Sequence, residues 1–92
     1  MAVIKVERQH ELGAAKARTA VEKVAKKLQK DLDAEYHWEG STLQFSRSGA
    51  KGHIDVGEED VRIEIKLGML LSPLKGKIEK TIEQEIDQHL LV

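Results

Sequence analysis

The chain has 92 residues, a formal net charge of −1 and no cysteine. Its length fits one domain covering residues 1–92, while the absence of thiols excludes disulfides, thiolate zinc sites and cysteine nucleophiles. No apolar run approaches the roughly 18–20 residues of a membrane span, and the N-terminal residues lack the apolar stretch of a signal peptide, so we expect a cytoplasmic protein.

The first predicted elements are a strand and an amphipathic helix. The segment "AVIKVER" (2–8) alternates apolar and polar side chains, which is the pattern of a half-buried strand. From Gly13 to Leu32 apolar residues instead recur every three or four positions, which predicts a helix with one apolar face. That face is rich in alanine and consists of Ala14, Ala17, Val21, Val24, Ala25, Leu28 and Leu32.

Four further strands are predicted, each with apolar residues at alternate positions. They cover "AEYHWE" (34–39), "TLQFSR" (42–47), "GHIDV" (52–56) and "VRIEIKL" (61–67). The dipeptides Gly-Ser at 40–41 and Gly-Ala at 49–50 suit two-residue hairpin turns, and a loop at 57–60 joins the last two strands. The expected apolar pairs are Trp38–Leu43, Tyr36–Phe45, Phe45–Ile54, Leu43–Val56, Val56–Val61 and Ile54–Ile63.

A second helix is predicted from Pro73 to the C-terminus, with Ser72 as its N-cap. Its apolar residues recur at every fourth position: Leu74, Ile78, Ile82, Ile86 and Leu90. The element order is then β-α-β-β-β-β-α. Because one face of the antiparallel meander is polar, both helices must cover the other face, which gives an α+β two-layer sandwich. We expect the first strand to pair antiparallel with 61–67; a parallel pairing beside 34–39 is the alternative.

The segment "RQHELGAAKAR" (8–18) concentrates charge where the first strand meets the first helix. A single glycine without Gly-Lys-Ser/Thr does not make a nucleotide-binding loop. Two interpretations remain. In one, Arg8, His10 and Arg18 cap the helix and border the core, because polar groups at buried junctions need partners. In the other, they form an anion site with the start of the helix.

Arg47 and the aromatic residues are the other candidates for binding. Arg47 ends an otherwise apolar row, so it needs a carboxylate, a backbone carbonyl or water, or it binds the carboxylate of a ligand. Tyr36, Trp38 and Phe45 share one face of one hairpin. They pack in the core, or they form the wall of a hydrophobic pocket between the sheet and the second helix.

Other chemistry finds little support in the residues. The four histidines have no helical i, i+4 spacing, so we expect no metal and no cofactor. No nucleophile has a base at a recognisable spacing, so we expect a protein without enzymatic activity. The lysines of the first helix have no interleaved aromatic residues, which argues against nucleic acid. Segment 1–30 has a charge of +5 and 31–92 of −6, which can guide self-association or contact with an anionic partner. The edge strand 34–39 could also pair with a second copy.

Four segments together resemble a known family: "RQHELGAAKAR" (8–18), "WEG" (38–40), "LQFSRSGAKG" (43–52) and "LGMLL" (67–71) before a final amphipathic helix. By their order and spacing the chain is similar to the small bacterial polyhydroxyalkanoic acid system proteins, or polyhydroxyalkanoate granule region proteins. The resemblance implies a cytoplasmic binding or regulatory factor of storage polyester granules that acts through a granule-associated protein or the granule surface. It implies no reaction.

A second hypothesis comes from the outline of the fold alone. A sheet held by a long C-terminal helix is similar to the helix-grip lipid-binding folds. By this analogy the protein would carry a hydrophobic acyl ligand such as a 3-hydroxy fatty acid. Trp38 and Phe45 would then contact the acyl chain, and Arg47 its carboxylate.

Overall fold

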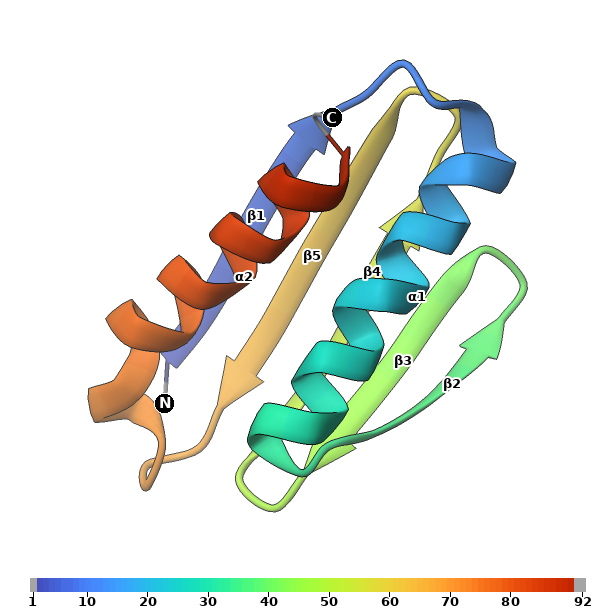
Figure 1. The fold of residues 1–92 in the computed structure, drawn as a ribbon. Coiled ribbons are helices and arrows are strands. Elements are labelled where there is room, and N and C mark those ends of the chain that lie inside the picture. Colours follow the sequence, from blue (N-terminus) through green and yellow to red (C-terminus); the bar gives the residue numbers. More distant parts are fainter. Residues whose placement is uncertain (1, 91–92) are drawn as a thin grey trace.

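The computed structural model describes residues 2–90. It contains a five-stranded antiparallel sheet, and both helices pack on one face of this sheet (Figure 1). The elements are β1 (Ala2–Gln9), α1 (Gly13–Leu32), β2 (Glu35–Glu39), β3 (Thr42–Arg47), β4 (Ala50–Val56), β5 (Asp60–Leu67), the 3₁₀ turn η1 (Ser72–Leu74) and α2 (Lys75–Leu90). The strand order is β1-β5-β4-β3-β2. The predicted α+β sandwich and the antiparallel pairing of the first strand with 61–67 are therefore confirmed.

The core lies between the sheet and the helices, where α1 packs on β4 and α2 packs on β1. The alanine-rich face of α1 allows this close packing, since it buries Ala17, Ala20 and Ala25 against the strands. Ala14 was expected on the same face but is exposed, because the buried stripe begins one turn into the helix. The largest side chains that are fully buried are Ile4, Leu43, Ile54, Leu67, Ile82 and Ile86.

The second hairpin turn differs from the prediction. Arg47 pairs with Ala50, so the turn is Ser48–Gly49, and Phe45 lies opposite Gly52 instead of Ile54. Both registers keep the apolar side chains on the same face, so the apolar pattern alone does not distinguish them. Gly49 has a φ of 86°, a conformation that glycine adopts without steric cost. The predicted pairs Tyr36–Phe45, Trp38–Leu43, Ile54–Ile63 and Val56–Val61 are confirmed.

The second helix begins later than predicted, because a short 3₁₀ turn precedes it. Ser72 was expected to be the N-cap, but its hydroxyl donates to the carbonyl oxygen of Gly68 at 3.0 Å and caps no helix amide. Leu74, expected in the apolar stripe, is exposed. The other four predicted positions of the stripe are buried: Ile78, Ile82, Ile86 and Leu90. Residues 68–74 thus form a loop of their own between β5 and α2.

Candidate functional site

Arg8 lies at the β1 edge of the sheet, where two carboxylates of α2 bind it. Its Nε is 2.9 Å from Oδ1 of Asp87, and its Nη2 is 3.4 Å from Oε2 of Glu83. The side chain is half-buried, as expected for a residue at the border of the core. Because two acids already neutralise this guanidinium, Arg8 is poorly placed to bind a free anion.

His10 is the one buried polar side chain among residues 2–90. Its Nε2 lies 3.1 Å from the carbonyl oxygen of Gly57, and the backbone N–H of Leu12 donates to its Nδ1 at 3.2 Å. A carbonyl oxygen only accepts, so this geometry fits a neutral ring with its proton on Nε2. The ring thereby joins the segment before α1 to the loop after β4 and satisfies polar groups that would otherwise be unpaired.

Arg18 and Trp38 meet at the opposite edge of the sheet. The guanidinium carbon of Arg18 lies 4.4 Å from the centroid of the Trp38 ring, within the range of a cation–π contact. The indole Nε1 of Trp38 donates to Oε2 of Glu22 at 3.1 Å. Burial, and then the neighbouring Glu22 carboxylate, raise the pKa of Tyr36 above its ordinary value of 10.0.

The structure therefore does not assemble the anion site considered from the sequence. Arg8 belongs to β1, while Arg18 stacks on a residue of β2, and these strands form opposite edges of the sheet. His10 hydrogen-bonds to backbone groups of its own end of the molecule. Each of the three residues has a local structural partner instead of a shared centre.

Arg47 does not point into the core, although it ends an apolar row. Its side chain is exposed, and Nη1 donates to the carbonyl oxygen of Leu32 at 3.0 Å while Nε donates to that of Ser48 at 3.1 Å. Of the partners considered from the sequence, the structure uses the backbone carbonyl. Leu32 is the last residue of α1, so the cation also lies at the negative end of the helix dipole.

An apolar cavity of about 330 Å³ lies beside Arg47, between the sheet and the two helices. Phe45 and Ile65 line it from the sheet, Leu28 from α1 and Ile78 from α2. This location matches the pocket considered from the sequence, with Phe45 as its aromatic wall. Trp38, which was expected to contact the same ligand, does not line this cavity.

The loop 68–74 presents large apolar side chains to solvent. Met69 is 83% exposed and Leu70 is 91% exposed. Leu71 turns inward and lines the cavity. The loop is held in place, because the backbone N–H of Gly68 donates to the carbonyl oxygen of Gly49 at 2.7 Å. The exposed pair therefore projects from an anchored loop at the end of the molecule that also holds the Ser48–Gly49 turn.

Residues 4–90 match the family described as polyhydroxyalkanoic acid system protein. The chain belongs to this family. The resemblance carried by the four sequence segments is thus confirmed, and membership links the protein to the polyhydroxyalkanoate system. No curated protein and no solved structure matches the chain. Among residues 2–90, neither helix has the length and apolar character needed to cross a membrane.

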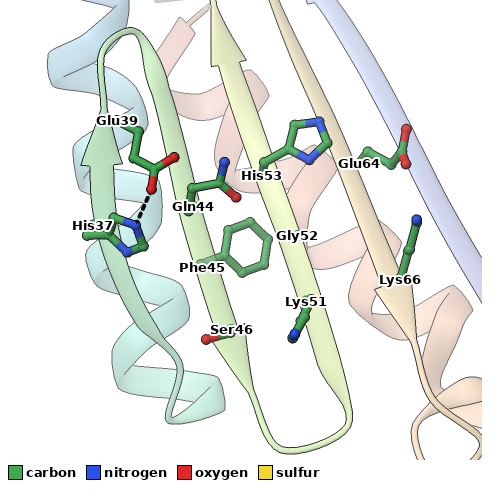
Figure 2. A pocket seen from close by; sticks show the side chains of 10 residues that line it. All are labelled: His37, Glu39, Gln44, Phe45, Ser46, Lys51, Gly52, His53, Glu64 and Lys66. Atoms are coloured by element: carbon green, nitrogen blue, oxygen red, sulfur yellow. Dashed lines mark hydrogen bonds and ion pairs between the residues drawn. The ribbon is translucent and has the colours of Figure 1, made fainter.

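In this polyhydroxyalkanoic acid system protein the uncovered face of the sheet carries a shallow polar hollow of about 390 Å³ (Figure 2). In this hollow Nε2 of His37 lies 3.1 Å from Oε1 of Glu39. His53 on β4 and Glu64 on β5 lie directly opposite each other. Within the described part of the chain no three His, Cys, Asp or Glu residues are grouped to hold a metal ion. Side chains of both signs alternate on this face, which is typical of a solvated sheet surface.

The free edge of β2 is the place where a second copy of the chain could pair with the sheet. β2 is the last strand in the sheet order, so its outer backbone groups have no neighbouring strand within the described sheet. Glu35 and Glu39 are exposed on it, and charged side chains on an edge strand disfavour pairing with a second copy. Dimerisation through 34–39 stays a prediction.

The loop 68–74 is the feature that the sequence reasoning missed. In the sequence analysis the segment "LGMLL" (67–71) was used only to recognise the family resemblance. A signal was present, since Met69, Leu70 and Leu71 are three consecutive large apolar residues that continue neither the alternation of the preceding strand nor the fourfold spacing of the next helix. The run therefore belongs to neither element and marks a separate segment between them.

Proposed function

We propose that this protein is a non-enzymatic binding module of the polyhydroxyalkanoate system. In this proposal it attaches to the surface of storage polyester granules in the cytoplasm, and the loop 68–74 makes the contact. One observation carries the proposal, namely the nearly complete exposure of Met69 and Leu70 at the tip of an anchored loop. Large apolar side chains that stand together on a surface mark interaction sites.

The energetics suit a reversible attachment. Burial of one Met or Leu side chain stabilises by roughly 1.5–3 kcal/mol, so the pair contributes roughly 3–6 kcal/mol on an apolar surface. The loop needs little reordering on binding, since the amide of Leu74 also donates to the carbonyl oxygen of Leu71 at 2.9 Å. An affinity of this order concentrates the protein on granules without making its binding permanent.

Positive charge next to the loop supports the same contact. Lys51 and Lys66 lie directly opposite each other on β4 and β5, a like-charge pair that destabilises a sheet. Lys75 and Lys77 are exposed in the first turn of α2. A polyester chain ends in a carboxylate, so a granule surface offers negative groups beside its apolar ester chains. Each lysine near an anionic surface adds about 1 kcal/mol, and salt weakens the effect.

The absence of enzymatic activity is part of the proposal. It is supported by the way the candidate residues are engaged: Arg8 with acids of α2, His10 with backbone groups, and Arg47 with the end of α1. These contacts stabilise structure. A catalytic role would instead need such groups aimed at a shared point in a cleft.

Sedimentation with amorphous polyester particles tests the attachment. The protein is compared with a Met69→Ser/Leu70→Ser variant and with Val3→Ser, a control that removes an apolar side chain 40% exposed on β1. We expect the unaltered protein and the control to sediment alike, and the loop variant to bind roughly a hundredfold more weakly or worse. Equal sedimentation of all three proteins would exclude the loop as the contact.

Fractionation of polyester-accumulating cells tests the cellular role. We expect the protein in the granule fraction, and we expect granule number or size to change when its gene is deleted. A protein that never co-sediments with granules, together with unchanged granules in the deletion strain, would contradict the proposal.

A second candidate function has its own supporting observation. The cavity lined by Phe45 beside Arg47 favours carriage of a hydrophobic acyl ligand such as a 3-hydroxy fatty acid. Two of the three residues expected to hold that ligand border the cavity. Trp38 lies elsewhere, so it has no part in this candidate function.

A further inference from the structure

We propose that the cavity is a binding site for one medium-chain aliphatic carboxylate, with the alkyl chain inside and the carboxylate at Arg47 and Lys77. The inference deepens the second candidate function, since it assigns the ligand class, its orientation and the residues that hold it. It requires no attachment to granules.

The cavity is a pocket that is partly open to solvent, since exposed residues such as Arg47 and Leu74 belong to its lining. A space of about 330 Å³ falls at the lower end of the range for ligand pockets. Its lining is mostly aliphatic, with Phe45 as the one aromatic side chain. An alkyl chain is the group that such a lining stabilises.

The polar groups of the cavity are few, and two of them are cations. Arg47 comes from the end of β3, while Lys77 and Thr81 come from successive turns of α2. Asp31 also lines the cavity, and Lys27 pairs with its carboxylate at 3.4 Å. The cations outnumber the one acid, which favours a ligand whose polar end is negative.

Arg47 retains donors for such a ligand. Its contacts with Leu32 and Ser48 use Nη1 and Nε, and a guanidinium has five N–H donors in a planar arrangement that suits carboxylates. Both contacts hold the side chain beside the cavity. The ligand therefore meets a cation that is already oriented, which lowers the entropic cost of binding.

The loop 68–74 forms the entrance. Leu71 and Leu74 line the cavity, and Leu74 remains 45% exposed. The same loop carries Met69 and Leu70 on its outside. If the granule attachment proposed above takes place through this loop, the entrance faces the surface on which hydroxyacyl chains are stored.

The size of the cavity limits the chain length. It has room for roughly ten groups of the size of a water molecule, so chains of about ten carbons fill it. Each methylene that enters should strengthen binding about fourfold. Affinity should therefore rise steeply from 3-hydroxybutyrate to 3-hydroxydecanoate and change little for longer chains.

Titration of the whole protein with 3-hydroxydecanoate, followed by backbone amide shifts in NMR, tests the site. We expect saturable shifts at Phe45, Ala50 and Leu71 and none at Trp38. Arg47→Gln should weaken binding roughly tenfold, while Arg62→Gln, which removes an equal charge from the uncovered sheet face, should not. The methyl ester of the ligand should bind the Arg47→Gln variant and the unaltered protein equally well.

Two variants that fill the cavity with a larger side chain provide a second test, which does not depend on whether any single variant folds. Ala50→Leu and Thr81→Leu both add volume inside the cavity and should abolish saturable binding. At least one of them should fold with an unchanged circular dichroism spectrum. Retained binding by a folded filling variant, absence of saturable shifts at millimolar ligand, or equal effects of Arg47→Gln and Arg62→Gln would overturn the inference.

Attachment and ligand binding fail separately. Met69→Ser/Leu70→Ser should lose adsorption to polyester particles and keep the titration with 3-hydroxydecanoate. Ala50→Leu should keep adsorption and lose the titration. A loss of both properties in the Ala50→Leu variant would contradict the assignment of the cavity as a distinct site.

Discussion

Replacement of Gly52 by alanine should destabilise the protein because Phe45 occupies the space above it. A Cβ at position 52 would lie 2.6 Å from Cζ of Phe45, 2.8 Å from the backbone oxygen of Glu64 and 3.0 Å from Cγ1 of Ile65. The phenyl ring can rotate away, but the Glu64 oxygen belongs to the β4–β5 ladder and cannot move without disturbing its hydrogen bonds.

The expected magnitude follows from two opposing effects. A methyl group forced into a packed core costs about 1–3 kcal/mol. Removal of a glycine from a strand returns about 0.5–1 kcal/mol, because the unfolded chain becomes less flexible. The free energy of unfolding should therefore fall by roughly 0–2.5 kcal/mol, with about 1 kcal/mol as the central value. For a domain of 92 residues each kcal/mol lowers Tm by about 4–8 °C.

Urea denaturation followed by circular dichroism measures this change, and Gly76→Ala is the matched control. A Cβ at Gly76 meets nothing within 4 Å, and the residue lies in α2, so alanine there should stabilise by about 0.5–1 kcal/mol. The two substitutions should have opposite signs. A stabilising Gly52→Ala would contradict the close contacts of position 52 with Phe45 and with the Glu64 oxygen.

Three further predictions concern single residues. Tyr36 is the only tyrosine, so ultraviolet absorbance reports the titration of this residue alone. The midpoint of the titration should lie above pH 10.0, and it should be lower in the Glu22→Gln variant. An unchanged midpoint in that variant would exclude the Glu22 carboxylate as a cause of the raised pKa. Because the folded state holds this proton more tightly, the contribution of Tyr36 to the free energy of unfolding should be constant below about pH 10 and be lost as the pH rises through the raised pKa. Arg8→Gln should cost less than about 2 kcal/mol in urea denaturation and still less in 1 M salt; a loss that persists in salt would indicate packing. Ile86→Ala, at a fully buried position, should cost about 2–5 kcal/mol in the same assay, whereas a loss below 1 kcal/mol would contradict its place in the core.

The helices and strands could be predicted because each has a clear period. The alternation in β1 and β5 and the three-to-four spacing in α1 depend only on which side faces the core. The hairpin register behaves differently. A shift of the partner by two residues keeps every side chain on its face, so the pattern "LQFSRSGAKG" permits turns at 48–49 and at 49–50. In the observed register the Phe45 ring occupies the space that a side chain at Gly52 would take, which favours the turn at 48–49.

The candidate residues were found by type, but their grouping depends on topology. Once β1 pairs with β5, Arg8 lies at the opposite edge from Arg18 and Trp38, so a shared anion site is excluded. The pattern offered a pocket beside Phe45 as one of two alternatives, but its lining could not be predicted, since it depends on how Leu71 and the ends of the two helices pack around Phe45.

Hydrogen–deuterium exchange on amorphous polyester particles tests the central claim most directly. The claim is that the loop 68–74 is the contact with the granule. Peptides that cover this loop should exchange more slowly on particles than in solution, and those that cover the β2 edge at 34–41 should exchange equally in both. Unchanged exchange in the loop, with protection at the β2 edge or on the uncovered sheet face, would contradict the account.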